Sequence, residues 1–162
     1  MSLRIIATGG TFDKHYDPLT GKLIFRDSVL PEALDRARLT LPVVFETVLA
    51  LDSLDMQDSH RQQIREACER SAEDCIVIVH GTDTMPETAQ VLGRSDLNKT
   101  IILTGAMVPY RIARSDAFFN LGFACAAASL APAGVYIAMN GHIFSWDDVM
   151  KNRDQGVFQA LR

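Results

Sequence analysis

The sequence has few cysteines, and none of them stands in a metal-binding or redox pattern. Cys68, Cys75 and Cys125 form no CxxC pair, and their number is odd. A disulfide framework is therefore not expected, and the spacing favours reduced, buried thiols. The first residues also lack the basic and apolar regions of an export signal. Together these absences predict a cytoplasmic protein.

Membrane and nucleic-acid features are missing as well. The longest apolar stretch, residues 121–133, is interrupted by Gly122, Ser129 and Pro132 and is too short to cross a bilayer. The formal net charge is -4, and acidic and basic residues are mixed along the chain without a basic block. We therefore expect neither a membrane span nor a nucleic-acid partner.

What the chain does contain is an alternation of strand and helix patterns over 162 residues, the size of one ordinary domain. Apolar, β-branched runs predict strands, and helical spacing of apolar residues predicts helices. The predicted strands are 3–7, 42–48, 75–79, 100–103 and 134–139, and the predicted helices are 28–38, 58–71, 86–93 and 116–130. This order predicts an α/β fold: a doubly wound, mostly parallel sheet of flavodoxin-like or Rossmann-like type, with helices on both faces.

The polar segment between the first strand and the first helix predicts a mobile loop or hairpin. Residues 12–22 hold two turn signals, Asp17-Pro18 and Thr20-Gly21, and residues 23–25 would be the returning strand. Ser28 is expected to cap the helix that follows it.

Two threonine-bearing motifs follow predicted strands directly. Thr8-Gly9-Gly10-Thr11 comes after the first strand, and His80-Gly81-Thr82-Asp83-Thr84-Met85 comes after the strand 75–79. Open α/β sheets bind ligands at the carboxyl ends of their strands, so the motifs are expected to form one site.

Each motif also has a structural interpretation. The glycine pair could form a phosphate loop or permit a tight turn, although GxGxxG and GxxxxGK[ST] are absent. Asp83 or Thr84 could cap the next helix, and Asp116 most simply caps the apolar helix that it precedes. His80 is expected to be a hydrogen-bonded structural histidine, because no second ligand stands at metal spacing.

Five segments in order resemble bacterial-type L-asparaginases and cover nearly the whole chain. They are Thr8–Phe12, Asp52–Met56, Val79–Met85, Thr104–Pro109 and Asp148–Lys151. The resemblance implies hydrolysis of L-asparagine to aspartate and ammonia. A weak side activity on glutamine stays open, because one methylene discriminates by only ~1–3 kcal/mol. It implies no metal and no organic cofactor.

The resemblance also implies the roles of individual residues. Thr11 would be the nucleophile, and Thr82, Asp83 and Lys151 would form the second catalytic group. Tyr16, in the loop after Thr11, would be the tyrosine of the family's lid. The implied substrate-binding residues are Gly10, Asp52, Ser53, Leu54, Gly81 and Ala106. Ser53 would bind the α-carboxylate, the Ala106 carbonyl would accept a hydrogen bond from the departing amide nitrogen, and Asp83 would also bind the α-ammonium group.

The chain departs from the family pattern in three ways. Phe12-Asp13 replaces a small apolar pair, and Leu54 stands where many members carry glutamine. The family's smaller C-terminal domain is expected to be absent, so that residues 1–162 form one catalytic domain. Asp13, Asp55 and Asp58, in that order, are then candidates for the acid that the second domain supplies.

The apolar helix 116–130 predicts self-association. Phe118, Phe119 and Phe123 are expected to point in different directions around it, more than one sheet contact would bury. We expect a homodimer or higher homo-oligomer that uses this surface. Two alternative functions stay open: an amino-acid-binding or sensing module with little catalysis, and a hydrolase of another small amide.

Overall fold

A six-stranded sheet forms the centre of the computed structural model, which describes residues 1–162. Its strands run in the order β4-β1-β5-β6-β7-β8, and all pair in parallel except β8. The bounds are β1 Leu3–Gly9, β4 Val43–Leu51, β5 Cys75–Val79, β6 Thr100–Thr104, β7 Gly134–Met139 and β8 His142–Ser145. The predicted mostly parallel α/β sheet is therefore confirmed.

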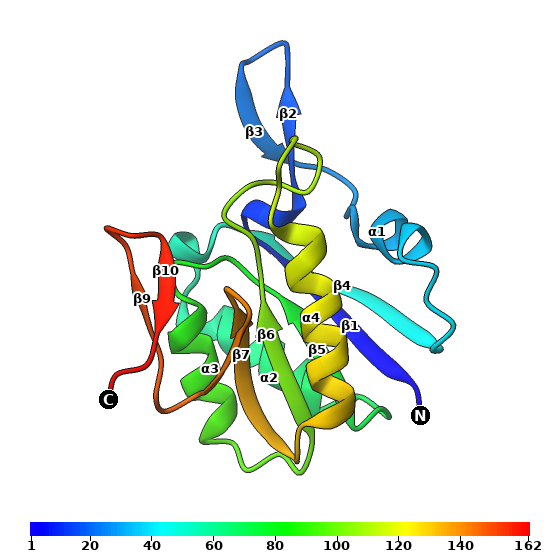
Figure 1. Ribbon diagram of the computed structural model, residues 1–162, viewed down its shortest axis with the longest axis vertical. Coiled ribbons are helices and arrows are strands. Elements are labelled where there is room, and N and C mark those ends of the chain that lie inside the picture. Colours follow the sequence, from blue (N-terminus) through cyan, green and yellow to red (C-terminus); the bar gives the residue numbers. More distant parts are fainter.

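Helices cover both faces of this sheet (Figure 1). Helices α1 (Leu30–Arg36) and α4 (Ala117–Leu130) bury one face, with Leu3, Ile5 and Ala7 of β1 in that core. Helices α2 (Asp58–Arg70) and α3 (Met85–Gly93) bury the other face, where Ile6 of β1 lies. With helices on both faces, the inner strands are buried on both sides. This is why their sequences are almost continuously apolar.

The strand order reverses beside the two threonine motifs, at the sheet edge between residues 8–11 and 80–85, which we call the crevice. From β1, the chain crosses to β4 on one side of β1 and then to β5 on the other, so the order reverses between β1 and β5. Ligands of open α/β sheets bind outside the carboxyl ends of the strands at such a reversal. Both motifs begin where β1 and β5 end.

Two hairpins extend from the body. Strands β2 (Lys14–Asp17) and β3 (Lys22–Phe25) pair antiparallel and project beyond the sheet (Figure 1). They form the hairpin expected for residues 12–25. Strands β9 (Met150–Asn152) and β10 (Val157–Gln159) form the second hairpin, close to α3 in the same view. No helix is long and apolar enough to span a membrane.

The sequence interpretation missed β8, β9 and β10. Each has only three or four residues, too few for a periodic pattern, and each depends on its partner strand. The first helix also begins at Leu30 rather than at residue 28. The Ser28 hydroxyl accepts a hydrogen bond from the Leu30 amide at 3.2 Å, but the N-cap position belongs to Val29.

The aromatic side chains of α4 are arranged differently from the prediction. Phe119 and Phe123 lie one turn apart and stack, with ring centroids 6.1 Å apart and planes 5° apart. Only Phe118 faces elsewhere, toward Tyr110 and under the Arg36 guanidinium. The expectation of three different directions is therefore wrong for one pair, since residues four apart share a helix face.

Candidate active site

The loops after β1 and β5 touch through their backbones. A Cβ atom at Gly10 would lie 2.5 Å from the Gly81 Cα and N atoms, so only glycine fits there. Gly10 also has a φ of 76°, in the region that favours glycine. The Gly10 amide donates to the Leu51 carbonyl at 2.9 Å, which joins a third strand end to the pair. The glycine pair thus serves close backbone approach, as well as a turn.

Lys151 links the side chains of two neighbouring residues in the second motif. Its Nζ atom donates to Thr82 Oγ1 and to Asp83 Oδ1, each at 2.8 Å. The Lys151 side chain is 8% exposed and the Asp83 side chain 36% exposed. A buried ammonium group between a hydroxyl and a carboxylate can hold or move a proton. Arg153 adds a second positive charge 3.9 Å from Asp83.

The β9–β10 hairpin brings Lys151 to this position. Lys151 lies opposite Phe158 of β10, and Phe158 is buried in the core beneath the sheet. The Phe158 amide donates to Asn140 Oδ1 at 2.8 Å, which ties the hairpin to the end of β7. The hairpin thus places the Lys151 amine beside Thr82 and Asp83, which come 69 and 68 positions earlier in the chain.

Thr11 lies half-buried at the start of a short 3-10 helix, Thr11–Asp13. The next residue, Phe12, is fully buried and stacks on Tyr110 with planes 10° apart. The Tyr110 amide also donates to the Phe12 carbonyl at 3.1 Å. Phe12 therefore fixes the backbone beside Thr11. The chain continues from this short 3-10 helix into strand β2 rather than into an α-helix, unlike a phosphate-binding loop.

Ser53 is buried against the second motif. Its Oγ accepts from the Thr84 amide at 3.1 Å, and its carbonyl accepts from Thr84 Oγ1 at 2.7 Å. A Cβ atom at Gly81 would lie 2.7 Å from Ser53 Cβ and Oγ, so this contact also requires glycine. The residues on either side of Ser53 make other contacts. Asp52 forms an ion pair with Lys14 at 2.6 Å, and Leu54 is 64% exposed.

The loop after β6 carries Ala106, which is buried. Asp116 holds this loop: its carboxylate accepts from the Met107 amide at 2.9 Å and the Val108 amide at 3.0 Å. Asp116 occupies the N-cap position of α4, but the expected cap through its side chain is wrong, because no such hydrogen bond forms. The Ser115 hydroxyl accepts from the Ala117 amide at 3.0 Å instead. The Asp116 carboxylate therefore binds amides of the loop after β6 instead of amides of α4. Nothing in the sequence indicates this contact.

Asn120 is a residue that sequence reasoning missed. It is buried in α4, and its side-chain amide donates to the Gly105 carbonyl at 2.9 Å and to Asp116 at 3.1 Å. The available signal was an asparagine within the otherwise apolar residues 117–128, one turn after Asp116. Buried polar groups need partners, so such a residue points to a backbone group nearby.

His80 is the structural histidine that the sequence predicts. It is fully buried; its Nδ1 donates to the Gly81 carbonyl at 2.7 Å, and its Nε2 accepts from the Thr88 hydroxyl at 2.8 Å. Burial lowers the His80 pKa to about 4, with the Gly81 carbonyl opposing and the positive charge of Arg61 adding to the shift. The ring therefore stays neutral and anchors the start of the motif.

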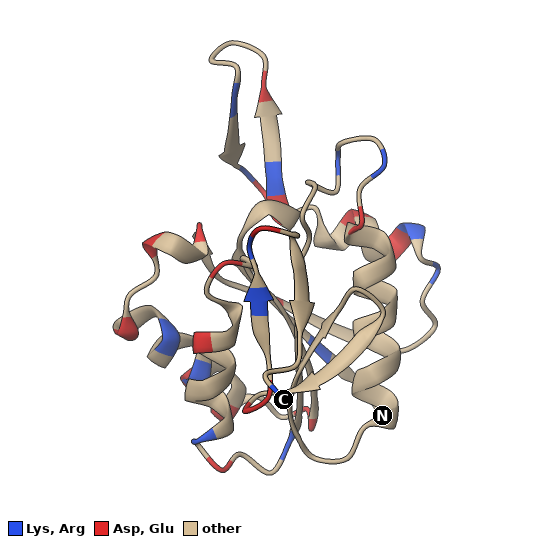
Figure 2. Ribbon diagram, turned by 60° about the vertical axis from the view of Figure 1, so that its left-hand side comes forward, with Lys and Arg blue, Asp and Glu red and all other residues tan.

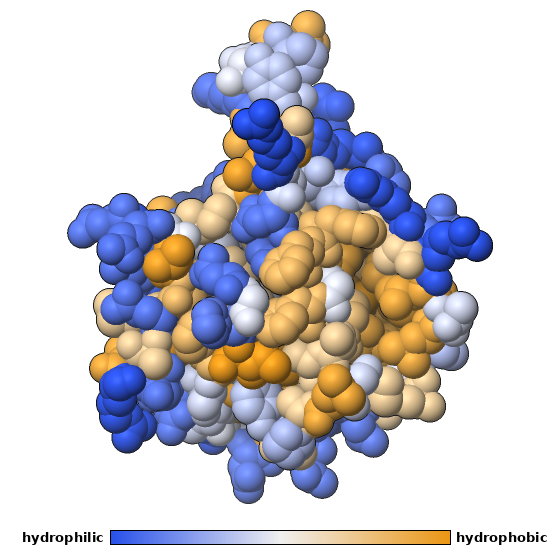
Figure 3. Space-filling model, viewed as in Figure 1, coloured by the Kyte–Doolittle hydropathy of each residue, from blue (hydrophilic) through white to orange (hydrophobic).

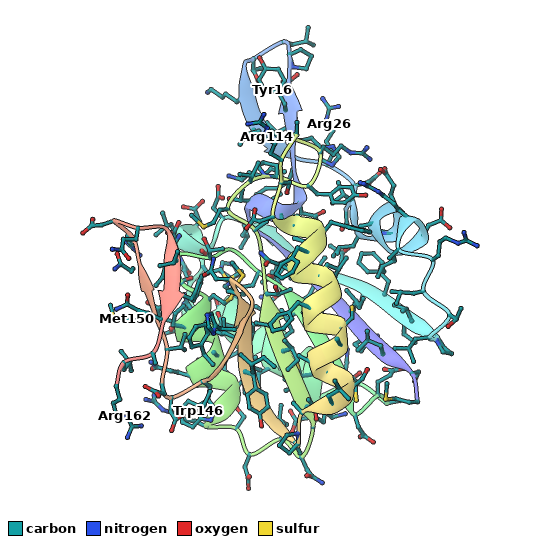
Figure 4. The ribbon with its side chains drawn as sticks, viewed as in Figure 1. Tyr16, Arg26, Arg114, Trp146, Met150 and Arg162 are labelled. Carbon is teal, nitrogen blue, oxygen red and sulfur yellow. The ribbon has the colours of Figure 1, made fainter.

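Two of the predicted residues, Tyr16 and Asp13, make no hydrogen bond to Lys151, Thr82 or Asp83. Tyr16 is 58% exposed on the β2–β3 hairpin, away from the β9 strand where Figure 4 labels Met150. Asp13 is 6% exposed and accepts from the Ser28 hydroxyl and the Val29 amide, at 3.0 and 2.7 Å. Asp13 is thus a connector between the first loop and α1, and its candidacy as an open substrate-binding acid is wrong. Asp55 and Asp58 are exposed.

The largest cavities lie elsewhere. One of about 460 Å³ adjoins Arg36 and residues 110–115, and one of about 360 Å³ lies between residues 37–41 and α4. Neither cavity is lined by Thr11, Thr82 or Lys151. No group of three or more His, Cys, Asp or Glu side chains is arranged to hold a metal ion. Charges of both signs are scattered along the ribbon in Figure 2.

Comparison with known proteins shows the family of the chain. Residues 2–160 match the family described as Asparaginase, N-terminal. The chain belongs to this family. It is 33% identical to L-asparaginase 2 of Escherichia coli over 178 residues, which cover 99% of the chain and 49% of that protein. It is also 34% identical to one subunit of the glutamyl-tRNA(Gln) amidotransferase of Methanococcus vannielii, over 96% of the chain and 37% of that subunit.

Solved structures of the asparaginase family share the fold. The thermostable L-asparaginase from Thermococcus kodakarensis superposes with a TM-score of 0.88 at 30% identity, over 99% of this chain and 51% of that one. The chain thus spans about half the length of the asparaginases that it matches.

Proposed function

We propose that this asparaginase-family chain hydrolyses the side-chain amide of L-asparagine, with Thr11 as the nucleophile. The observation that carries the proposal is the contact of Lys151 with both Thr82 and Asp83, at 2.8 Å each. Family membership supports amide hydrolysis, and the contact supplies the proton-handling group that a threonine nucleophile needs.

The reaction would proceed in two steps. In the first, Thr11 Oγ1 attacks the amide carbon, and the C–N bond breaks to release ammonia. Thr82 would take the Thr11 proton as it passes its own proton to Lys151, and Lys151 would at the same time give a proton to the leaving nitrogen, so that its charge is unchanged; Thr82 and Lys151 lie in hydrogen-bond contact. In the second, water attacks the ester on Thr11 and releases aspartate. Backbone amides of the crevice would stabilise the oxyanion in both steps.

The substrate's charged ends would be bound on either side of the amide. Asp83, with 36% of its side chain exposed, would bind the α-ammonium group. Ser53, with the backbone around Gly81, would bind the α-carboxylate. Gly10, Asp52, Leu54 and Ala106 complete the proposed binding residues. The exposed Leu54 offers no hydrogen bond, and Lys14 already neutralises Asp52. Tyr16 could join the site only if the hairpin moved toward it.

Ammonia release tests the proposal directly. The panel would contain asparagine, glutamine and short amides, from neutral to alkaline pH. Asparagine turnover that disappears in Thr11→Ala, with an unchanged unfolding midpoint, is the expected result. Equal ammonia release from Thr11→Ala would refute the assigned nucleophile. Glutamine belongs in the panel because one methylene discriminates by only ~1–3 kcal/mol, and because relatives include an amidotransferase.

A second candidate is binding of a small amide or amino acid without efficient turnover. The partial exposure of the Asp83 side chain favours it, since the exclusion of water from a site strengthens catalytic electrostatics. Saturable binding of asparagine in calorimetry, without ammonia release, would support this candidate against the first.

We also propose that the chain forms a homodimer through α4. This helix has no charged residue, and Phe119 and Leu130 are 62% and 84% exposed. Figure 3 shows the wide apolar surface on the side of the molecule where α4 lies. The 360 Å³ groove beside it is lined mostly by apolar side chains, as a two-fold contact would require. A monomer at micromolar concentration in sedimentation would overturn this proposal.

A cytoplasmic location stays a prediction from the cysteines, all three of which are free thiols.

A further inference from the structure

Arg61 is a buried cation directly behind the proposed carboxylate-binding wall. It lies in the first turns of α2 and is only 7% exposed. Burying a guanidinium group is costly unless an anion and hydrogen-bond acceptors compensate for the lost water. The partners of Arg61 therefore decide whether its burial is purely structural.

Those partners leave the Arg61 charge largely uncompensated. The nearest carboxylate belongs to Asp58, at 3.8 Å, and that side chain is fully exposed to water. The Nε atom is buried and has no acceptor at all. Nη1 reaches the Met56 carbonyl at a long 3.4 Å. An exposed carboxylate at this distance is weakly bound, since water screens it.

The remaining contact leads into the site. Arg61 Nη2 donates to Thr84 Oγ1 at 3.0 Å, and that hydroxyl donates onward to the Ser53 carbonyl at 2.7 Å. The Thr84 amide in turn donates to Ser53 Oγ. Two residues therefore separate a buried positive charge from the crevice, and Ser53 packs against Gly81 on the far side.

We propose that Arg61 is a positioning and specificity-determining residue: it fixes the Ser53–Thr84 pair and favours amide substrates that carry a carboxylate. The inference rests on the proposed amide hydrolysis. A carboxylate bound at Ser53 would be the anion that Arg61 lacks in the chain itself. A positive potential in a low-dielectric wall acts on a bound anion more strongly than it would through water.

Two substrates that differ in one charge test the proposal. L-Asparagine carries the α-carboxylate, whereas L-asparagine amide replaces it with a neutral carboxamide and keeps the ammonium group. In Arg61→Met, KM for asparagine should rise roughly tenfold, the effect of losing one charge-assisted interaction. The value of kcat should change less than about threefold, because the loss falls on binding of the carboxylate. KM for the amide should stay unchanged or fall.

Two further variants separate charge from simple damage to the loop. Arg61→Lys keeps the charge and should recover most of the KM for asparagine. Arg65→Met removes an arginine from the same helix that pairs with Glu69 at 3.0 Å, and should leave KM unchanged for both substrates.

Each outcome decides a separate question. Equal increases in KM for both substrates in Arg61→Met, or unchanged KM for asparagine, would overturn the role of Arg61. Wild-type protein that releases no ammonia would instead overturn the proposed function. In that case asparagine and its amide are compared by calorimetry: selective loss of asparagine binding in Arg61→Met supports the inference, and equal binding refutes it.

Discussion

His80 should make the protein lose stability in mild acid. Burial holds its pKa at about 4 in the folded state, against an ordinary value of 6.5. The unfolded chain therefore binds a proton on His80 between these values while the folded chain does not. The resulting stability is fully present above pH 6.5 and is lost as the pH falls toward 4.

The size of this loss follows from the two pKa values. Each pKa unit corresponds to about 1.4 kcal/mol, so the loss approaches about 3 kcal/mol below pH 4. Between about pH 7.5 and pH 5, His80 alone should contribute a loss of about 2 kcal/mol. That is a large share of the ~5–15 kcal/mol that stabilises an ordinary domain.

Denaturant unfolding at about pH 7.5 and pH 5 measures the effect in wild type and in His80→Asn. The asparagine amide can replace ring Nδ1–H, which donates to the Gly81 carbonyl, but it cannot titrate. Carboxylates with a lowered pKa in the folded protein, such as Asp17 and Glu73, also make the folded state less stable in acid. Both proteins contain these carboxylates, so their contribution cancels when the two stability losses are compared. The variant should lose about 2 kcal/mol less than wild type over this interval. Equal losses in the two proteins would refute the reasoning.

Three further changes test the site. Lys151→Met should lower kcat at least ~10²-fold with a smaller change in KM, because the amine acts on the reacting groups rather than on substrate binding. An unchanged kcat would exclude the proton relay. Gly81→Ala should cost ~1–3 kcal/mol and abolish turnover, since the new Cβ lies 2.7 Å from Ser53. Gly122→Ala, where a Cβ meets nothing within 4 Å, is the matched control and should be neutral or stabilising. Asp116→Ala should cost about 1–3 kcal/mol in urea unfolding by freeing two loop amides, and wild-type stability would contradict that role.

The sequence was sufficient for the five parallel strands of the central sheet and for the place of the two threonine motifs. Residues 3–7 and 75–79 are apolar at nearly every position, and such runs form strands buried on both faces. Parallel strands bring their carboxyl ends to one edge, so loops about 70 residues apart could be placed together. This argument needs only the order of the elements, and the family resemblance then gave the motifs a chemical interpretation.

Side-chain partners were harder to predict because distant groups compete for them. Asp116 precedes a helix and could cap it, yet the Met107 and Val108 amides take its carboxylate. Asp13 looked available to a substrate, but it is used to bind the Val29 amide. In both cases a local preference loses to an unsatisfied backbone group that only the folded chain brings near.

We expect the charges around the proposed site to give a bound amino acid one preferred orientation. Asp83 contacts Lys151 and Arg153 and is partly exposed, so we expect this carboxylate to bind the ammonium group. The buried charge of Arg61 lies behind Ser53 and favours a carboxylate there. A zwitterion bound between these two ends would lie beside Gly81, whose backbone touches Gly10, the residue before Thr11. We therefore expect the amide to reach the nucleophile because the two ends of the substrate are held, and not because the crevice fits the amide closely.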